Sequence, residues 1–357
     1  MPMRVVIAAG GTAGHVVPAL AVADELRAEG VDVVWVGGER AEARFVPTAG
    51  YELRTITVEG LSRRNPFKAV RALGRAGAAA LAARRLLGEL RPDAVLGGGG
   101  YVAGPVGLAA AAARIPLVLT EADSHLGLAN RLLAPFARRV CLAFAIAGRE
   151  GPRYLLTGRP VPAPFRDRAA ARQRFGLAAE EQCVLVFGGS LGARSLNAVA
   201  PVAFASPPPR VLHIAGARDF ATLSSPGPHY ELREYISPFG EALAACDLAI
   251  ARAGGSVFEL AAHGLPALLV PYPHATGDHQ TANARWMADA GAAVVLPDAE
   301  LTAERLRDEV DAMLSDGPRL RAMADASAAL ARPDAAAVVA RELLALARRK
   351  QPRRLAS

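Results

Sequence analysis

The sequence predicts an α/β protein of two domains, each a parallel sheet covered by helices on both faces. At 357 residues the chain is longer than a usual single domain. Short apolar runs alternate with helical patterns, which favours parallel strands joined by crossover helices. The pattern restarts after a proline-rich stretch, 160–164. We expect domains at 1–160 and 161–340, facing across a cleft where such sheets bind ligands, with a helix end and basic tail at 341–357.

The apolar runs give the expected strands. In the first half they are 4–9, 32–36, 93–96, 116–120 and 139–144. In the second half they are 183–187, 210–215, 247–251, 267–270 and 292–296. A long helix is expected from Pro66 to about Leu90, because Asn65 can cap a helix and proline is tolerated at its first position.

The composition excludes several classes of protein. Hydrophobic residues make up 52% and charged residues 21%, which suits a folded chain with a large core. Cys141, Cys183 and Cys246 lie far apart in apolar runs, so we expect buried free thiols and a reducing compartment. No secretory signal is evident, and no run reaches the roughly 18 apolar residues of a spanning helix. A membrane would therefore be met at its surface only.

The net charge of +7 is concentrated in the first half of the chain. Between Arg63 and Arg91, eight cations face a single acid, Glu89. One interpretation is an ordinary solvated helix packed on the sheet. The other is a surface that attracts anionic lipids, worth about 1 kcal/mol per cation. Nucleic acid is disfavoured, since the aromatic residues needed for base stacking are missing from this segment.

Two glycine-rich turns follow strands in the first half, at 10–15 and at 97–101. Glycine lets the backbone approach a ligand closely, and the start of the next helix offers free N–H groups. A diphosphate or a sugar is the natural ligand, and neither turn matches the dinucleotide fingerprint or a Walker loop. The alternatives are a tight strand-to-helix turn capped by His15 and, for the second turn, a flexible hinge.

The second half repeats this design at 188–193, where Ser190 adds a hydroxyl donor. A further strand–loop–helix segment is 252–256, with Glu259 about one turn into its helix. A carboxylate there can accept hydrogen bonds from both hydroxyls of a ribose. The alternative is an acid that only complements the helix dipole.

Polar side chains gather once more after Pro271, where the amide of Gln280 suits sugar hydroxyls. His274, Asp278 and His279 also suggest a metal, but no further ligand set stands out. No two aspartates stand two residues apart, so the usual Mg²⁺ or Mn²⁺ diphosphate site of metal-dependent transferases is not evident.

Five segments in this order resemble the motifs of the MurG family, the peptidoglycan UDP-N-acetylglucosamine (UDP-GlcNAc) transferases of glycosyltransferase family 28. They are 10–15, 97–105, 188–193, 252–259 and 271–283. The resemblance implies the two-domain GT-B fold, facing Rossmann-like domains, and no cofactor or metal. It implies inverting transfer of GlcNAc from UDP-GlcNAc to undecaprenyl-diphosphate-linked MurNAc-pentapeptide, which converts lipid I into lipid II in peptidoglycan synthesis. It also implies a peripheral position on the cytoplasmic face of the membrane, contacted by 65–75.

The resemblance also implies roles for individual residues. His15 is the candidate general base, which removes the proton of the acceptor 4-hydroxyl as that oxygen attacks the anomeric carbon. The implied substrate-binding residues are Thr12, Ala13, Gly14, Asp123, Ser190, Ile236, Gly255, Ser256, Glu259 and Gln280. The implied acceptor-diphosphate residues are Gly11, Gly98, Gly99 and Tyr101.

The chain departs from the family pattern at several positions. Ala13 stands where a third glycine is usual, and Asp123 replaces an asparagine. The usual donor-contacting arginine is Pro162 here, with Arg159 or Arg166 as its candidate substitutes. Two alternatives stay open beside the lipid I transferase. One is a related GT-B enzyme with another acceptor, or a UDP-GlcNAc epimerase, and the other is a non-catalytic sugar-nucleotide binding module.

Overall fold

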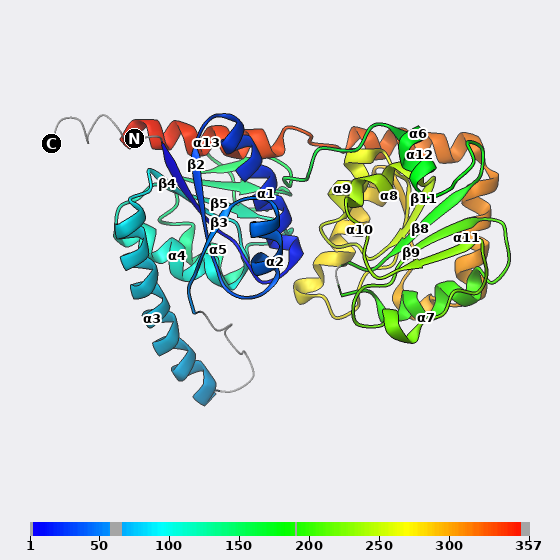
Figure 1. Ribbon diagram of the computed structural model, residues 1–357, viewed down its shortest axis with the longest axis horizontal. Coiled ribbons are helices and arrows are strands. Elements are labelled where there is room, and N and C mark those ends of the chain that lie inside the picture. Colours follow the sequence, from blue (N-terminus) through cyan, green and yellow to red (C-terminus); the bar gives the residue numbers. More distant parts are fainter. Residues whose placement is uncertain (1–2, 58–65, 190, 351–357) are drawn as a thin grey trace. The chain divides into compact units, whose positions relative to one another are not determined.

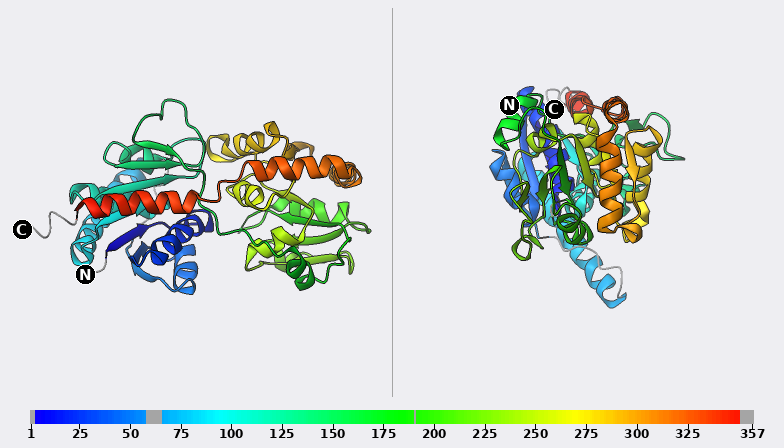
Figure 2. Two further views of the ribbon diagram at one scale, coloured as in Figure 1. Left: turned by 90° about the horizontal axis from the view of Figure 1, so that it is seen from above. Right: turned by 90° about the vertical axis from the view of Figure 1, so that its right-hand side faces the viewer.

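The computed structural model describes residues 3–57, 66–189 and 191–350 and divides into two compact units. The first unit comprises Met1–Val161 and Arg332–Ser357, and the second comprises Pro162–Ala331. The sequence had grouped 161–340 together, whereas the structure assigns 332–340 to the first unit. The reason is the last helix, α13 (Ala335–Lys350), which packs against the first sheet and its helix α1 (Ala13–Ala28) (Figure 2).

The first unit is a parallel sheet of seven strands with helices on both faces (Figure 1). The strand order is β3-β2-β1-β4-β5-β6-β7. The strands are β1 (Arg4–Ala8), β2 (Asp32–Gly37), β3 (Glu52–Thr55), β4 (Ala94–Gly97), β5 (Leu117–Glu121), β6 (Arg139–Leu142) and β7 (Tyr154–Leu156). The other helices are α2 (Ala41–Thr48), α3 (Pro66–Leu90), α4 (Gly100–Ala112) and α5 (Leu128–Leu133). Alternate side chains of β1 face opposite layers, Val5 and Ile7 toward α1 and α13, and Val6 toward α4.

The second unit repeats the plan with six parallel strands in the order β10-β9-β8-β11-β12-β13. The strands are β8 (Cys183–Phe187), β9 (Arg210–Ile214), β10 (Tyr230–Arg233), β11 (Leu248–Ala251), β12 (Ala267–Leu269) and β13 (Ala293–Val295). The α-helices are α6 (Arg168–Arg174), α7 (Arg194–Ala203), α8 (Phe239–Ala245), α9 (Val257–His263), α10 (His279–Asp289), α11 (Ala303–Ser315) and α12 (Gly317–Ala329). Short 3₁₀ turns are η1 (Phe220–Thr222), η2 (Thr276–Asp278) and η3 (Asp298–Glu300).

The predicted fold class is confirmed, and all ten predicted strands are present. Three strands were missed: β3, β7 and β10. Each lies at the edge of its sheet. β3 and β10 mix polar with apolar residues and β7 has only three residues, so none of them gives a long apolar run. Helix α3 runs from Pro66 to Leu90 as predicted, while its expected cap Asn65 lies outside the described residues. No helix among the described residues is long and apolar enough to cross a membrane.

A buried histidine ties β9 to α7 and β10 in the second unit. His213 is fully buried, its Nε2 lies 3.0 Å from Asn197 Oδ1, and its Nδ1 lies 2.7 Å from the hydroxyl of Tyr230. Asn197 in turn donates to the carbonyl of Ala215. Burial lowers the pKa of His213 to about 4, so the ring stays neutral and its two hydrogen bonds fix one tautomer.

This histidine should make the stability of the second unit depend on pH. Between about pH 6.5 and about pH 4 the unfolded chain takes up a proton that folded His213 does not, so stability falls as the pH falls. Its contribution from about pH 7 to about pH 5 is about 2 kcal/mol. Urea unfolding followed by Trp286 fluorescence should show that loss in the wild type and a smaller one in His213→Gln. Equal losses in both proteins would contradict the assignment.

Candidate functional site

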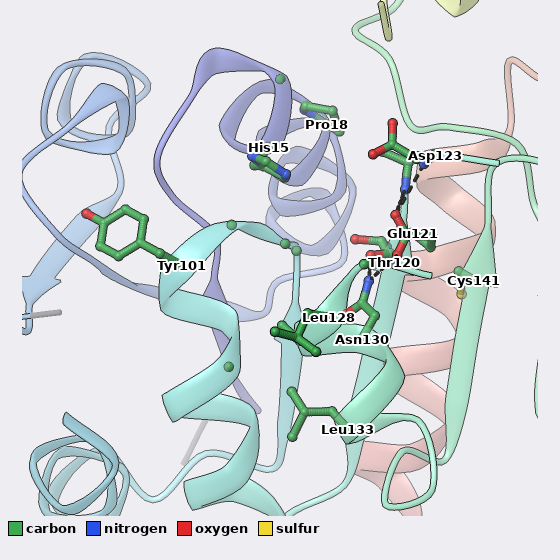
Figure 3. Close-up of a pocket in the computed structure, with 18 of the residues that line it drawn as sticks. His15, Pro18, Tyr101, Thr120, Glu121, Asp123, Leu128, Asn130, Leu133 and Cys141 are labelled. Atoms are coloured by element: carbon green, nitrogen blue, oxygen red, sulfur yellow. Dashed lines mark hydrogen bonds between the residues drawn. The ribbon is translucent and has the colours of Figure 1, made fainter. Parts of the chain in front are cut away.

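The loops after β1, β4, β5 and β7 meet at the carboxyl edge of the first sheet, where they border a pocket of about 780 Å³. His15, Gly99, Asp123 and Arg159 line its polar end. Figure 3 shows His15 and Asp123 there. Parallel strands bring these residues together because all their carboxyl ends lie at one edge. The sequence motifs at 10–15 and 97–101 are therefore neighbours in space.

His15 lies in the first turn of α1, which begins after Thr12. The hydroxyl of Thr12 does not cap the helix; its Oγ1 lies 3.2 Å from Nδ1 of His15. When Nδ1 carries the ring hydrogen and donates it to Thr12, Nε2 keeps its lone pair and can accept a proton. The contact therefore supports the ring orientation and is compatible with the tautomer that a base needs.

The surroundings of His15 favour the neutral imidazole. Burial lowers the pKa of His15, the positive charge of Arg159 lowers it further, and the charges of Asp123 and Glu42 act in the opposite direction. Arg159 is held in place by donating to the carbonyl of Gly14. The net shift is downward, so the ring is available as a proton acceptor at neutral pH.

The second glycine turn packs directly against the first. A Cβ on Gly99 would lie 2.6 Å from Cδ2 of His15, and one on Gly100 would lie 1.8 Å from the carbonyl oxygen of Gly10. Both residues have positive φ, 92° and 77°. The sequence suggested an anion site or a hinge. The structure adds another reason for glycine here, since the edge of the His15 ring lies on Gly99 at the start of α4.

Two of the residues expected to meet the acceptor diphosphate already have a partner. The backbone N–H of Gly11 and the hydroxyl of Tyr101 both donate to the carboxylate of Glu42, at 2.8 and 2.7 Å. Figure 3 shows Tyr101 pointing away from His15 and Asp123. Sequence reasoning missed Glu42, because an acid in the first turn of α2 looks like any dipole-complementing residue.

Beside His15 the end of β5 carries a second buried carboxylate, Glu121. It accepts hydrogen bonds from the backbone N–H groups of Ala122, Asp123 and Gly127 and from the amide of Asn130. Burial raises the pKa of Glu121 despite these bonds. The carboxylate thus shapes the loop that presents Asp123 to the pocket.

The far end of the pocket is apolar. It runs between α4 and α5 and is lined by Leu108, Leu128, Leu132 and Leu133. Leu132 and Leu108 are more than half exposed. The pocket therefore joins a polar end at the strand edge to an apolar end at the surface of the first unit.

The donor residues expected in the second unit follow the carboxyl ends of neighbouring parallel strands. Ile236, which is buried, follows β10; Gly255, Ser256 and half-buried Glu259 follow β11. Gln280 opens α10 after β12, and its amide oxygen accepts the N–H of Tyr272 at 2.9 Å. These positions share one edge of the second sheet. Ser190 lies outside the described residues.

A buried arginine, Arg252, connects the loops at this carboxyl edge of the second sheet. No role was assigned to it from the sequence. Arg252 pairs with Asp298 at 2.6 Å, donates to Ser195 Oγ at 2.6 Å, and donates to the carbonyls of Val270 and Pro271. It thereby joins the loops after β11 and β12 to the first turn of α7. Such a network fixes the loops that carry the donor candidates.

The two candidate substitutes for the arginine absent at Pro162 lie in different places. Arg159 lines the His15 pocket of the first unit. Arg166 lies beside Asp247, which precedes β11, and His263, which ends α9. That is the amino-terminal edge of the second sheet, whereas the donor candidates follow the carboxyl ends of its strands. Among the described residues, no three His, Cys, Asp or Glu side chains are arranged to hold a metal ion.

Two family models match the chain: the glycosyltransferase family 28 N-terminal domain at residues 5–142 and the family 28 C-terminal domain at residues 183–339. The first match runs from β1 to β6 of the first sheet, and the second covers all six strands of the second sheet. The chain belongs to glycosyltransferase family 28. The family predicted from the five motifs is thus confirmed, and with it a glycosyltransferase activity.

Relatives of known name lie close in sequence. A protein of Alkalilimnicola ehrlichii is 45% identical over 98% of this chain and 100% of its own length. One of Moorella thermoacetica is 42% identical over 90% of this chain and 93% of its own. Both are named UDP-N-acetylglucosamine–N-acetylmuramyl-(pentapeptide) pyrophosphoryl-undecaprenol N-acetylglucosamine transferase.

Solved structures agree with the family assignment. The crystal structure of Acinetobacter baumannii MurG is 31% identical, covers 96% of this chain and 99% of its own, and superposes with a TM-score of 0.75. A UDP-N-acetylglucosamine 2-epimerase from Listeria monocytogenes covers 94% of both chains at a TM-score of 0.69, but it is 14% identical. That similarity shows the shared GT-B fold alone.

Proposed function

We propose that this chain transfers GlcNAc from UDP-GlcNAc to the 4-hydroxyl of undecaprenyl-diphosphate-linked MurNAc-pentapeptide, turning lipid I into lipid II. One observation supports the proposed acceptor: His15, whose ring is kept neutral beside Arg159, lies at the polar end of a pocket whose other end is apolar. Such a pocket suits an acceptor with a sugar diphosphate head and a hydrocarbon tail. The named relatives support the identity of both substrates.

The reaction is a single displacement. Nε2 of His15 takes the proton of the acceptor hydroxyl, that oxygen forms a bond to the anomeric carbon, and the bond from this carbon to the diphosphate breaks with its electrons leaving on UDP. One displacement inverts the α-linked donor to a β-linked product. This step uses the tautomer in which Nδ1 donates its hydrogen to the hydroxyl of Thr12, 3.2 Å away, and Nε2 is unprotonated.

We assign the donor to the carboxyl edge of the second sheet. Glu259 binds the ribose hydroxyls, Gln280 the GlcNAc hydroxyls and Ile236 the uracil, while Gly255 and Ser256 line the same edge. The start of α7 at Arg194 offers backbone N–H groups to the diphosphate, since the first N–H groups of a helix have no partner within the helix and no side chain caps this one. The Arg252 network supports this assignment, because it fixes three of these loops at once.

We also propose that the enzyme works on the cytoplasmic face of the membrane, held there by the first unit. Exposed apolar side chains gather on the packed helices α3, α4 and α5 and just after α5: Leu81, Leu108, Leu128, Leu132 and Phe136. Exposed Arg84, Arg85 and Arg131 lie on the same helices. Cations around an apolar surface attract an anionic bilayer. Segment 65–75 was the expected membrane contact; Asn65 and the side chains of 66–75 lie outside what the structure describes, so the part of this segment in the surface stays a prediction.

Replacing Leu132 by glutamate should weaken binding to vesicles of anionic lipid by about tenfold, because it removes an exposed apolar contact and adds a repelled charge. Val202→Glu is the matched control: Val202 on α7 is 65% exposed against 63% for Leu132, but lies in the second unit. Cosedimentation measures the bound fraction. Equal binding by the wild type and both variants would exclude this surface as the membrane contact.

The transfer itself is tested with the purified chain, radiolabelled UDP-GlcNAc and a lipid I analogue. We expect labelled, β-linked disaccharide product. Free GlcNAc, epimerised UDP-sugar without transfer, or UDP-GlcNAc binding without any turnover would point instead to a hydrolase, an epimerase or a binding module.

A further inference from the structure

We propose that Glu42 is a positioning residue: its carboxylate is an internal anion that fixes the loop carrying His15 against the amino-terminal end of α4. Its consequence for catalysis rests on the proposed function, whereas its effect on the His15 ring does not. Glu42 is fully buried, although it lies in the first turn of the short helix α2.

The carboxylate of Glu42 accepts three hydrogen bonds from three separate segments. Its Oε2 accepts the N–H of Gly11, in the turn after β1, at 2.8 Å. Its Oε1 accepts the N–H of Gly38, in the turn after β2, at 2.9 Å and the hydroxyl of Tyr101, on α4, at 2.7 Å. Hydrogen bonds to a charged acceptor are about twice as strong as neutral ones.

The surrounding backbone leaves room for this carboxylate and for little else. A Cβ on Gly10 would lie 2.6 Å from Oε1 of Glu42, and one on Gly37 would lie 2.8 Å from its Cγ. A Cβ on Gly38 would lie 2.0 Å from the hydroxyl oxygen of Tyr101. The side chains of Glu42 and Tyr101 thus leave no room for a Cβ at these three positions, so glycine is required at each of them.

Glu42 therefore holds, by hydrogen bonds, the two segments between which the His15 ring lies: the turn after β1 and the start of α4. Gly11 precedes His15 by four residues in the first glycine turn, and Tyr101 follows Gly99, on which the ring packs. Without the acid, the turn after β1 and the start of α4 lose their shared acceptor. A displacement of about 1 Å at such a site can cost 10²-fold in rate.

The turn after β8 in the second unit is different. A Cβ on Gly189 would meet no described atom within 4 Å, whereas one on Gly188 would lie 2.3 Å from Cβ of Ala193, so among the described residues this turn is open at Gly189. An open glycine turn can receive a ligand phosphate. The first turn already contains its anion, which agrees with a role in holding His15 rather than in binding a nucleotide diphosphate.

The same acid contributes to the charge around His15. The groups that face His15 are Arg159, which lowers its pKa, and Asp123 and Glu42, which raise it. Burial alone would raise the pKa of Glu42, but the hydrogen bonds from Tyr101, Gly11 and Gly38 outweigh it and keep the acid ionised. Removing this charge should therefore lower the pKa of His15 further.

Two substitutions separate the charge of Glu42 from its contact with Tyr101. Glu42→Gln removes the charge and one acceptor position, whereas Tyr101→Phe removes the contact and keeps the charge. The pKa of His15 is measured in the substrate-free protein by NMR titration of its ring, assigned with His15→Gln. We expect a lower pKa in Glu42→Gln and an unchanged one in Tyr101→Phe.

In the transfer assay we expect both variants to lose about 10- to 100-fold in kcat, with UDP binding unchanged. Glu42→Asp, which keeps the charge on a shorter side chain, should recover the His15 pKa and part of kcat. Tyr51→Phe is the matched control, because Tyr51 donates to Asp24 at 2.6 Å in the same unit, outside the pocket, and should leave kcat unchanged.

A folded Glu42→Gln protein with the wild-type His15 pKa and wild-type kcat overturns the proposal. A fall in thermal stability alone, with both quantities unchanged, shows a purely structural role and also overturns it. If Glu42→Gln does not fold, Tyr101→Phe and Glu42→Asp decide the matter by their kcat relative to Tyr51→Phe. Should the wild type transfer nothing, the NMR titration still tests the positioning of His15, and only the proposed function fails.

Discussion

Replacing His15 by alanine should lower kcat for GlcNAc transfer by about 10²- to 10⁴-fold, the usual contribution of a general base. The variant removes the imidazole that takes the acceptor proton. UDP binding should not change, because the donor candidates Glu259 and Gln280 belong to the second unit and His15 to the first. Isothermal titration with UDP and single-turnover transfer rates measure the two effects separately.

The pH dependence provides a second test of His15. A base works when it is unprotonated, so kcat/KM should fall as the pH falls through the pKa of His15. Burial and Arg159 hold that pKa below 6.5, and the acid limb should therefore lie below pH 6.5. Arg159→Gln should move it upward, since a positive charge beside the ring is removed. Normal transfer by His15→Ala, or an acid limb unmoved by Arg159→Gln, would show that another group accepts the proton.

Replacing Gly100 by alanine should destabilise the first unit by at least about 2 kcal/mol. The added Cβ would lie 1.8 Å from the carbonyl oxygen of Gly10, a backbone atom that cannot turn aside, and φ at this position is 77°. Trp35 reports the change directly, because its Nε1 donates to the carbonyl of Ala9, next to Gly10. Urea unfolding followed by Trp35 fluorescence should show an earlier midpoint and a disturbed folded baseline.

The chain offers matched controls for Gly100. Gly88 is exposed on α3 and an added Cβ meets nothing within 4 Å, so Gly88→Ala should stabilise its helix by about 1 kcal/mol. Gly192, with φ 77°, is the counterpart in the second unit, since its Cβ would lie 1.9 Å from the carbonyl oxygen of Ala215. Gly192→Ala should disturb Trp286 rather than Trp35. Gly100→Ala with wild-type stability would mean that the two turns do not touch.

Secondary structure was predicted correctly from the sequence where a strand is buried on both faces. The central strands β4 and β8 are apolar throughout, and β1 is apolar after Arg4, because helices cover both faces of each sheet, so these strands were predictable from the sequence. Edge strands such as β3 and β10 pack on one side only and mix polar with apolar residues, so they were missed.

The candidate site divides in the same way. His15 and the glycine turns could be found from sequence because each directly follows a predicted strand. Glu42 and Arg252 could not. Two of the three partners of Glu42, Gly11 and Tyr101, are 31 and 59 residues away along the chain, and the hydrogen-bond partners of Arg252 are 18 to 57 residues away, so no local sequence pattern indicates these contacts. Nor could sequence show that the N–H of Gly11 is already bonded to an internal acid.

The amino-acid sequence alone therefore determined the fold class, the family and the positions of the turns, since burial patterns and strand–glycine–helix signals are local. The tertiary structure alone decided that the turn after β1 already holds an internal carboxylate, and that α13 belongs with the first sheet. The physical reason is that these features depend on atoms that the parallel sheets bring within hydrogen-bonding or van der Waals distance. Contacts between residues far apart in the chain cannot be predicted from a short stretch of sequence.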